Sequence, residues 1–255
     1  GFSVNTNSGA GQALRTLNQT NNSLKTTQNR ISTGKDVSSA KDNAALLNIA
    51  NKLTADVSGL NSVKSSLDRA SSTLDVASAA SEAVSSVLLE LREKAVAASD
   101  SGLDADSRQA LNDEFNSLKN SLTSIVDNAS FNGTNLLKGD NISAIVNEDG
   151  SSTFDVAGQD YSLGGSVLTL GAGQDLSSAG DAASALSAID ASINNVGSNL
   201  STLGSAASGF EQQRNFVSKL SDSIEIGISN MVDSNLATES AKLQSLQVTQ
   251  ELGLK

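Results

Sequence analysis

The 255-residue chain contains no cysteine, histidine, proline or tryptophan, and its aromatic content is 3%. Without histidine or cysteine it lacks the usual ligands of zinc, copper, haem and iron–sulfur sites. Cysteine proteases and Ser-His-Asp hydrolases are excluded for the same reason, whereas carboxylate and Ser–Lys chemistry are compatible with the composition. Because proline most reliably interrupts helices, its absence permits very long ones.

Charge and hydropathy disfavour two further kinds of partner. The net charge of −11 argues against binding nucleic acid, which requires a surplus of lysine and arginine. No apolar run reaches the roughly 18 residues that a membrane-spanning helix needs. The first residues also lack the charged, apolar and cleavage regions of a secretory signal peptide. We therefore predict no nucleic-acid partner, no membrane span and no cleaved signal.

Apolar residues recur every seven positions in two rows from residue 46 to residue 98. Such spacing over several heptads is typical of a helix in a coiled-coil-like bundle, here roughly 80 Å long at about 1.5 Å per residue. Ser81 and Asp56 are the interruptions of the two rows. We expect Ser39–Asp42 to form a capping box at the start, and Gly102 to close the helix in a left-handed conformation.

A second helix is predicted to start near Asp104–Ser107 and return antiparallel to the first, because the connection is short. Helical periodicity reappears near Asp181 and continues toward the C-terminus despite Gly197, Gly204 and Gly209. We call the apolar rows of these three helices the rod seam and predict that they pack together. Its members are Leu53, Leu60, Leu67, Leu74, Leu88, Leu91, Leu111, Phe115, Leu118, Ile189, Val196, Leu203, Phe210, Val217 and Ile224.

Between these helices, residues 129–178 have the composition of a small β-rich insert. Turn signals and short apolar runs predict a β-hairpin followed by two more short strands. The acidic turn at Asn147–Gly150 lacks the ligand spacing of a calcium loop, so we predict no metal site there. The predicted turns are Phe131–Gly133 and Asn147–Gly150, and the predicted strands are Ile142–Val146, Thr153–Val156, Tyr161–Leu163 and Val167–Leu170.

The two ends of the chain carry weaker apolar stripes, with Leu14, Leu17 and Leu24 before Gly34 and Leu243 and Leu246 near the C-terminus. Isolated helices of this kind are marginal without tertiary partners. Each terminal segment should therefore require the other one, or a neighbouring molecule. These five leucines are our candidate assembly residues.

Several motifs, in order along nearly the whole chain, resemble the bacterial flagellins, the flagellar filament proteins, and in particular the short α-proteobacterial type. The most specific motif is the Gln28–Lys35 turn followed by Ser39–Ala45. The others are Asn5–Asn7, Leu91–Val96, Phe131–Thr134 and Thr238–Gln244.

The resemblance implies a mainly α fold: a long-helix, coiled-coil-like rod bundle with a small β-hairpin insert. Residues 1–40 would be an N-terminal inner-tube segment, and 41–130 the N-side rod helices. Residues 131–178 would form the outer insert, and 179–233 the C-side rod helix. Residues 234–255 would be the C-terminal inner-tube segment. The family usually continues past a Gln-X-Leu-Gly pattern into leucine-rich sequence, so we expect this last segment to be truncated.

The resemblance also implies a structural subunit that self-assembles into the extracellular flagellar filament for motility, with no enzymatic activity and no cofactor. Its expected partners are other flagellin subunits, hook-associated and cap proteins, and a cytosolic export chaperone. Export would use the flagellar type III route. Two alternatives stay open: a flagellin-like surface protein that binds a ligand such as a polysaccharide, and the hook–filament junction protein.

One departure from the family pattern concerns the receptor-facing surface. Members recognised by the flagellin-sensing Toll-like receptor carry Gln-Arg before a Val-Arg-Glu-Leu core, whereas this chain has Leu89 and Glu90 before Leu91. An anion in place of a cation should repel an acidic partner. We therefore expect weak or no receptor recognition through the surface that comprises Leu89, Glu90, Arg92, Glu93 and Glu114.

Overall fold

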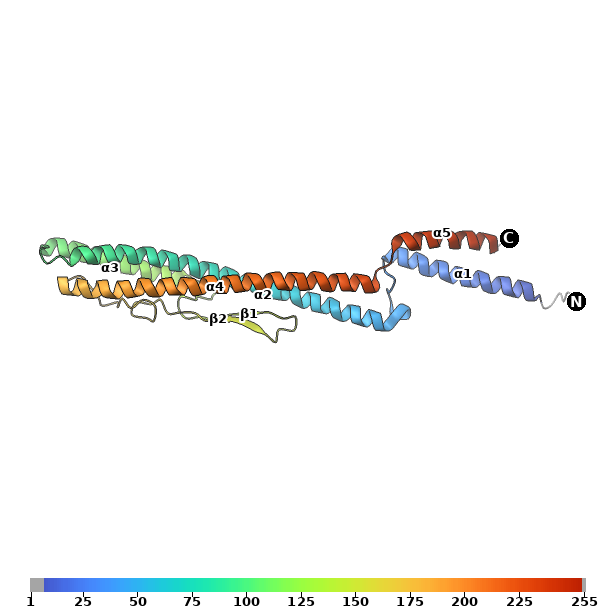
Figure 1. Ribbon diagram of the computed structural model, residues 1–255, viewed down its shortest axis with the longest axis horizontal. Helices are drawn as coiled ribbons and strands as arrows, with labels where there is room; N and C mark the ends of the chain where they lie inside the picture. Colours follow the sequence, from blue (N-terminus) through green and yellow to red (C-terminus); the bar gives the residue numbers. More distant parts are fainter. Residues whose placement is uncertain (1–6, 254–255) are drawn as a thin grey trace. The chain divides into compact units, whose positions relative to one another are not determined.

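The computed structural model describes residues 7–253 and divides the chain into two compact units. The first unit comprises residues 1–58 and 220–255, and the second comprises residues 59–219. Parts of two predictions lie outside the described residues, namely Asn5 and Thr6 of the N-terminal motif and the final residues 254–255. The described part is mainly helical with one small β-hairpin, which confirms the predicted fold class (Figure 1).

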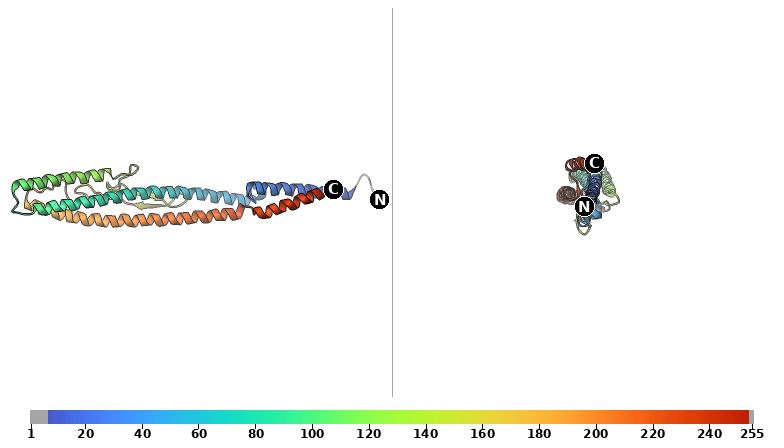
Figure 2. Two further views of the ribbon diagram at one scale, coloured as in Figure 1. Left: turned by 90° about the horizontal axis from the view of Figure 1, so that it is seen from above. Right: turned by 90° about the vertical axis from the view of Figure 1, so that its right-hand side faces the viewer.

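In the first unit, helices α1 (Ser8–Thr33) and α5 (Leu236–Gly253) run antiparallel, side by side (Figures 1 and 2). The Asn7 side chain caps the start of α1 by accepting from the Ala10 N–H at 3.1 Å. Gly34 ends the helix with φ 71°, and its N–H donates to the Arg30 carbonyl at 2.9 Å. This confirms the predicted end at Gly34, where the left-handed conformation costs glycine little.

The remainder of the first unit is held by a short β-like contact and a small core. The Asp36 N–H donates to the Val232 carbonyl at 2.7 Å, and the Ser234 N–H donates to the Gly34 carbonyl at 2.9 Å. Val37, Ala50 and Val232 are buried together beneath this contact, with Leu46 and Met231 packed against them. The connections to α1 and α5 are therefore tied to each other.

Helix α2 (Ala40–Ala98) starts differently from the prediction. The Asp42 carboxylate accepts from the Ser39 N–H at 2.8 Å and from the Ser39 hydroxyl at 2.9 Å, which lowers the pKa of Asp42. Because the Ser39 hydroxyl donates to Asp42, it does not accept a hydrogen bond from a backbone N–H of the helix. The predicted capping box is therefore wrong for the Ser39 side chain. Asn43 is extended and caps the long helix instead, accepting from the Leu46 N–H at 3.0 Å.

The end of α2 also corrects a prediction, because Gly102 does not adopt the left-handed conformation. Its N–H donates to the Asp100 carboxylate at 2.8 Å. The Arg108 guanidinium donates to the carbonyls of Ala98 and Asp100, the latter at 2.9 Å. With a left-handed glycine, backbone N–H groups would have satisfied carbonyls at the end of the helix. Here a side chain from the next helix donates to carbonyls instead.

Helices α2, α3 (Ala105–Asn128) and α4 (Ala179–Val232) lie side by side in the second unit (Figures 1 and 2). Helix α3 begins where predicted, and Asp104 caps it by accepting from the Ser107 N–H at 2.9 Å. Salt bridges fix the antiparallel pairing of α2 with α4, from Arg92 to Asp190 at 2.7 Å and from Arg214 to Asp68 at 2.9 Å. Helix α4 is continuous through its glycines, as predicted.

The insert contains the predicted hairpin, with β1 (Ile142–Ile145) antiparallel to β2 (Thr153–Val156). Asn132 and Gly133 have φ values of 49° and 83°, so the predicted turn at Phe131–Gly133 is present. The strands predicted at Tyr161–Leu163 and Val167–Leu170 are absent from the described structure. Their backbone groups bond elsewhere: the Asn195 amide donates to the Val167 carbonyl at 3.1 Å, and the Leu170 N–H donates to the Ser192 hydroxyl at 3.3 Å.

Candidate assembly surfaces

The insert is attached closely to the helices of the second unit. At Gly59 of α2, an added Cβ would lie 2.4 Å from the Glu148 carbonyl oxygen. At Gly209 of α4, it would lie 2.9 Å from the Phe154 ring, which packs at a tilt of 58° against Phe210 with centroids 4.8 Å apart. Glycine therefore allows the hairpin to approach both long helices.

A buried hydroxyl pair explains one interruption of the heptad rows. Ser81 is fully buried in α2, and its hydroxyl donates to the Tyr161 hydroxyl of the insert at 3.1 Å. Burial raises the pKa of Tyr161, while the bond to Ser81 opposes the rise. Sequence reasoning missed this pair. The available signal was a small polar residue within an apolar row, in a chain with one tyrosine.

Lys119 of α3 is also buried although it is charged. Its Nζ donates to the carbonyls of Ala172 at 2.9 Å and Gln174 at 2.5 Å, and lies 5.4 Å from the centre of the Phe115 ring. Desolvation lowers the pKa of Lys119, and the charge of Asp175 partly opposes this. The lysine ties the loop that precedes α4 to α3, and no periodicity in the sequence indicated this role.

The structure buries most of the residues assigned to the rod seam. Leu53, Leu111, Leu118 and Ile224 are half-buried. The fully or nearly fully buried members are Leu60, Leu67, Leu74, Leu88, Leu91, Phe115, Ile189, Val196, Leu203, Phe210 and Val217. In the second unit these side chains come from all three helices, so the helices share one apolar interior.

The α1–α5 pair has a small and partly polar interior. Arg30 of α1 forms salt bridges with Glu239 of α5 at 3.2 Å and with Asp36 at 2.7 Å. Thr27 Oγ1, Arg30 Nε and Glu239 Oε2 are buried without a hydrogen-bond partner among the described residues. A buried network that is only partly satisfied contributes little net stability.

The candidate assembly leucines differ in their exposure. Leu24 is buried, whereas Leu17, Leu243 and Leu246 are half-buried. Leu14 is 60% exposed, and Leu252, near the end of α5, is 68% exposed. The pair therefore leaves apolar surface uncovered along both helices, as expected for elements that contact further copies.

The five residues of the receptor-facing surface are on α2 and α3. Leu89, Glu90 and Glu93 are exposed, and Arg92 is paired with Asp190. Glu114 accepts from Lys94 at 2.6 Å, which raises the pKa of that lysine. Glu90 thus presents an anion to solvent at the position where the family pattern has a cation.

Charge is divided unequally between the units. The first unit has eight Lys and Arg against eight Asp and Glu, so its formal charge is zero. The second has nine against twenty, which accounts for the whole net charge of −11. Helix α1 alone carries Arg15, Lys25 and Arg30 without an acidic residue.

A long-helix rod with an attached hairpin, together with a terminal helix pair that leaves apolar surface open, defines a self-assembling structural subunit. Family models match accordingly: the bacterial flagellin N-terminal helical region over residues 4–142 and the C-terminal helical region over residues 186–255. The chain belongs to the bacterial flagellin family, whose members are structural subunits of the extracellular flagellar filament.

Named relatives agree with this assignment. The chain is 42% identical to flagellin FljM of Caulobacter vibrioides, over 99% of this chain and 92% of that protein. It is 33% identical to a flagellin of Brucella melitensis, over 99% and 93%. The crystal structure of Bacillus cereus flagellin shares the fold with a TM-score of 0.52 and 23% identity, over 58% of this chain and 86% of that one. These matches do not favour either alternative function.

None of the helices in residues 7–253 is both long and apolar enough to cross a bilayer. Within the same residues, histidine, cysteine and carboxylate side chains form no cluster that could hold a metal ion.

Proposed function

We propose that α1 and α5 are the polymerisation elements of this filament subunit, and that neighbouring copies complete their packing. The observation that carries the proposal is the exposure of their apolar side chains. Leu14 and Leu252 are largely exposed, and among the described residues of α5 only Glu239 is buried. Two helices with so little shared core are marginal by themselves.

Coupling the final ordering of these helices to docking would keep free subunits apart. Ordering opposes association, so binding becomes favourable only where several copies cover the apolar stripes together. The filament tip supplies such an arrangement. The zero formal charge of the first unit also suits close contact between copies, because no net repulsion opposes it.

Seeded growth tests this assignment. The complete subunit is added to pre-formed filament seeds, and extension is followed by electron microscopy. We expect wild-type extension, and loss of extension for Leu14→Ser, because an exposed leucine contributes to contacts between copies and not to the subunit's own core. Leu14→Met keeps an apolar side chain and serves as the matched control. Normal extension by Leu14→Ser would contradict the role of this stripe.

Leu24→Ala and Leu246→Ala should also impair polymerisation and leave the rod helices folded, as judged by circular dichroism. Leu24 is buried within the α1–α5 pair, so its loss also weakens the pair itself. Unchanged filament yield from both variants would refute their assignment as assembly residues. Failure of the wild type to extend any seed would instead favour the surface-binding alternative.

Family membership supports further parts of the same function. We infer that hook-associated and cap proteins contact the assembled filament, and that an export chaperone binds the subunit in the cytosol. The subunit would leave by the flagellar type III route without a cleaved signal peptide, and would have no enzymatic activity. Secretion by a strain with a defective flagellar export apparatus would contradict this route.

We also propose weak or no recognition by the flagellin-sensing Toll-like receptor. The exposed Glu90 carboxylate and the neighbouring Glu93 carboxylate support this, since both would face an acidic partner. In a receptor-reporter assay, the double variant Leu89→Gln with Glu90→Arg should be more potent than the wild type. Full potency of the wild type in this assay would contradict the proposal.

A further inference from the structure

A polar groove of about 510 Å³ lies along α1 in the first unit, with α5 at its edge. Its charged residues are Arg15 and Arg30 of α1 and Lys242 of α5, and none of its lining residues is acidic. Arg30 is paired with Glu239 and Asp36. Arg15 and Lys242 form no salt bridge with any residue that the structure describes. The subunit therefore leaves two cations of this groove without a counter-charge.

The exposed side of α1 continues this surface. Leu14, which precedes Arg15, is 60% exposed. Lys25 lies about three helical turns after Leu14, so both residues are on the same side of the helix. Lys25 is exposed, and no salt bridge among the described residues includes it. We call Leu14, Arg15, Lys25 and Lys242 the cationic face.

The end of α4, residues 220–232, belongs to the same unit and carries the opposite charge. It contains Asp222 and Glu225 and no lysine or arginine. Both carboxylates are exposed, and neither forms a salt bridge within the described part of the chain. Ile226, beside Glu225, is 62% exposed. A spacing of three and four residues places these three side chains on one side of the helix, and we call them the acidic face.

We propose that the cationic face of one subunit binds the acidic face of a second copy of the chain. The proposal rests on the proposed function, in which neighbouring copies complete α1 and α5, and it names the surface that they use. Each face combines uncompensated charges of one sign with an exposed apolar side chain, Leu14 on one and Ile226 on the other. Opposite charges attract across such a contact, whereas two identical faces repel each other.

The contact joins two different surfaces, so a bound copy keeps one of its two faces free for the next copy. A head-to-tail contact of this sort continues from copy to copy, and it produces an open helical filament where the rotation does not close. Pairing either face with its own equivalent would bring like charges together. The separation of the two charges within the first unit therefore suits a filament subunit.

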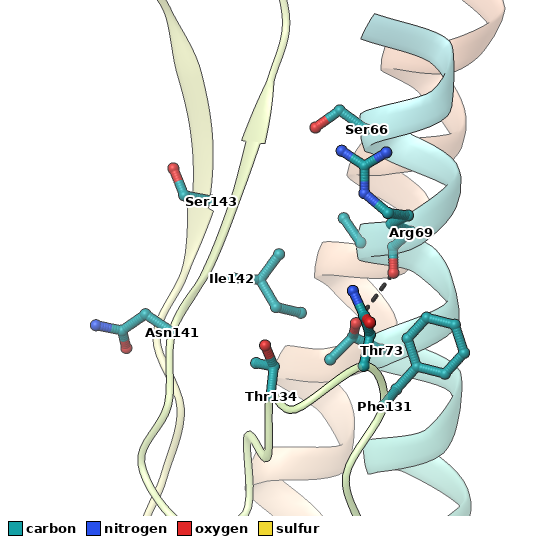
Figure 3. A pocket seen from close by; sticks show the side chains of 10 residues that line it. Ser66, Arg69, Thr73, Phe131, Thr134, Asn141, Ile142 and Ser143 are labelled. Atoms are coloured by element: carbon teal, nitrogen blue, oxygen red, sulfur yellow. Dashed lines mark hydrogen bonds between the residues drawn. The ribbon is translucent and has the colours of Figure 1, made fainter. Parts of the chain in front are cut away.

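A lone exposed arginine does not make such a face, as Arg69 of the second unit shows. It lies beside a hollow of about 250 Å³ between α2 and the insert, and the other lining residues of this hollow are uncharged. The side chains of Asn141 and Ser143 point away from α2 (Figure 3), so they add no donors toward Arg69. Arg69 therefore provides a control position, an exposed cation outside both faces.

Seeded extension by the complete subunit, followed by electron microscopy, tests the contact. The cationic-face variant carries Arg15→Glu and Lys25→Glu, and the acidic-face variant carries Asp222→Lys and Glu225→Lys. Each variant alone should extend seeds roughly tenfold more slowly than the wild type, because its two faces then present charges of the same sign. An equimolar mixture of the two variants should recover extension, since each copy again meets a face of opposite charge.

Two controls separate this contact from a general effect of net charge. Arg69→Glu reverses an exposed arginine outside the faces and should extend at the wild-type rate. Asp75→Lys with Glu82→Lys adds the same positive charge as the acidic-face variant, at exposed positions of α2. A labelled cationic-face variant should enter filaments grown with the acidic-face variant, but not filaments grown with this second control. Circular dichroism checks that every variant keeps the helix content of the wild type.

Two results would overturn the contact. They are extension at the wild-type rate by both face variants on their own, and a mixture of the folded face variants that does not extend. Loss of extension by Leu24→Ala and Leu246→Ala, together with either result, would leave the proposed function intact. Normal extension by those leucine variants would count against the proposed function, while recovery in the mixture would still establish this contact. The two proposals can therefore fail independently.

Discussion

The rod helices of the second unit and the α1–α5 pair of the first differ in how completely each buries its own apolar stripe. In the second unit, seam residues from α2, α3 and α4 are mostly buried, and the insert covers part of the surface that three helices leave open. In the α1–α5 pair, the buried residues are Thr20, Leu24, Thr27 and Glu239. The second unit is completed within one chain, whereas we propose that other copies complete the pair.

Charge separates the same two regions. The second unit contains the entire net charge of −11, and the first is neutral. A net negative surface keeps proteins soluble by mutual repulsion. A neutral surface meets no such repulsion when identical copies pack closely. If the proposed function holds, different parts of the chain provide solubility and self-association.

The largest contrast should come from the same substitution made in both regions. Leu67→Ala in the second unit should lower the free energy of unfolding by about 2–5 kcal/mol, because Leu67 is fully buried. Leu17→Ala in α1 should cost less than about 1 kcal/mol, because Leu17 is half-buried. Urea unfolding followed by circular dichroism measures both. Equal losses would show that the α1–α5 pair is as well packed as the rod.

Glycine substitutions sharpen the comparison within the second unit. Gly59→Ala should destabilise it by about 1–3 kcal/mol, since the new Cβ would press on the Glu148 backbone. Gly204→Ala meets nothing within 4 Å and should stabilise α4 by about 0.5–1 kcal/mol. Thermal unfolding distinguishes the two signs. A stabilising Gly59→Ala would mean that the insert is not held against α2.

Tyr161→Phe should cost about 1–3 kcal/mol, because it leaves the buried Ser81 hydroxyl without its partner. Adding Ser81→Ala should recover much of this loss, since neither polar group then remains. A double-mutant cycle on the full chain gives the coupling energy. A coupling near zero would show that the pair does not help to hold the insert.

The smallest effect should be the dependence on acidic pH. Hydrogen bonds from Ser107 lower the pKa of Asp104, and those from Ser39 lower the pKa of Asp42. A depressed carboxyl pKa contributes stability above its unfolded value, and this is lost as the pH falls through the folded pKa. Asp104→Asn keeps a capping side chain without the titration, so its thermal midpoint should fall less below about pH 4. A parallel decline in variant and wild type would contradict this.

Periodic and local features were predictable from the sequence. The heptad rows predicted α2 and α4, Gly34 predicted the end of α1, and the Asn-Gly and Asp-Gly pairs predicted turns that are present. Each of these depends on a few neighbouring residues. The strands expected at Tyr161–Leu163 and Val167–Leu170 were wrong. The Tyr161 N–H donates to the Leu137 carbonyl, and the backbone of the second segment bonds to side chains of α4.

The helix ends also show that a cap made by neighbouring residues is easier to predict than one made by a residue of another helix. The start of α3 near Asp104 was predicted correctly, and its cap is local, since Ser107 is three residues away. Gly102 was misassigned because Arg108, which comes from the next helix, donates to the last carbonyl of α2 and to the Asp100 carbonyl beyond it. Asn43 was overlooked as the cap of α2. The spacing of Ser39 and Asp42, just before it, predicted a capping box at those two residues instead.

By itself, the sequence determined that this chain forms long helices with one short insert, and its motifs determined the family. A seven-residue period and the absence of proline are properties of the chain alone, whatever it later contacts. Only the tertiary structure decided which polar groups are buried and how closely the hairpin approaches Gly59. Those outcomes depend on residues far apart in sequence, whose approach is set by the packing of whole helices and not by local spacing.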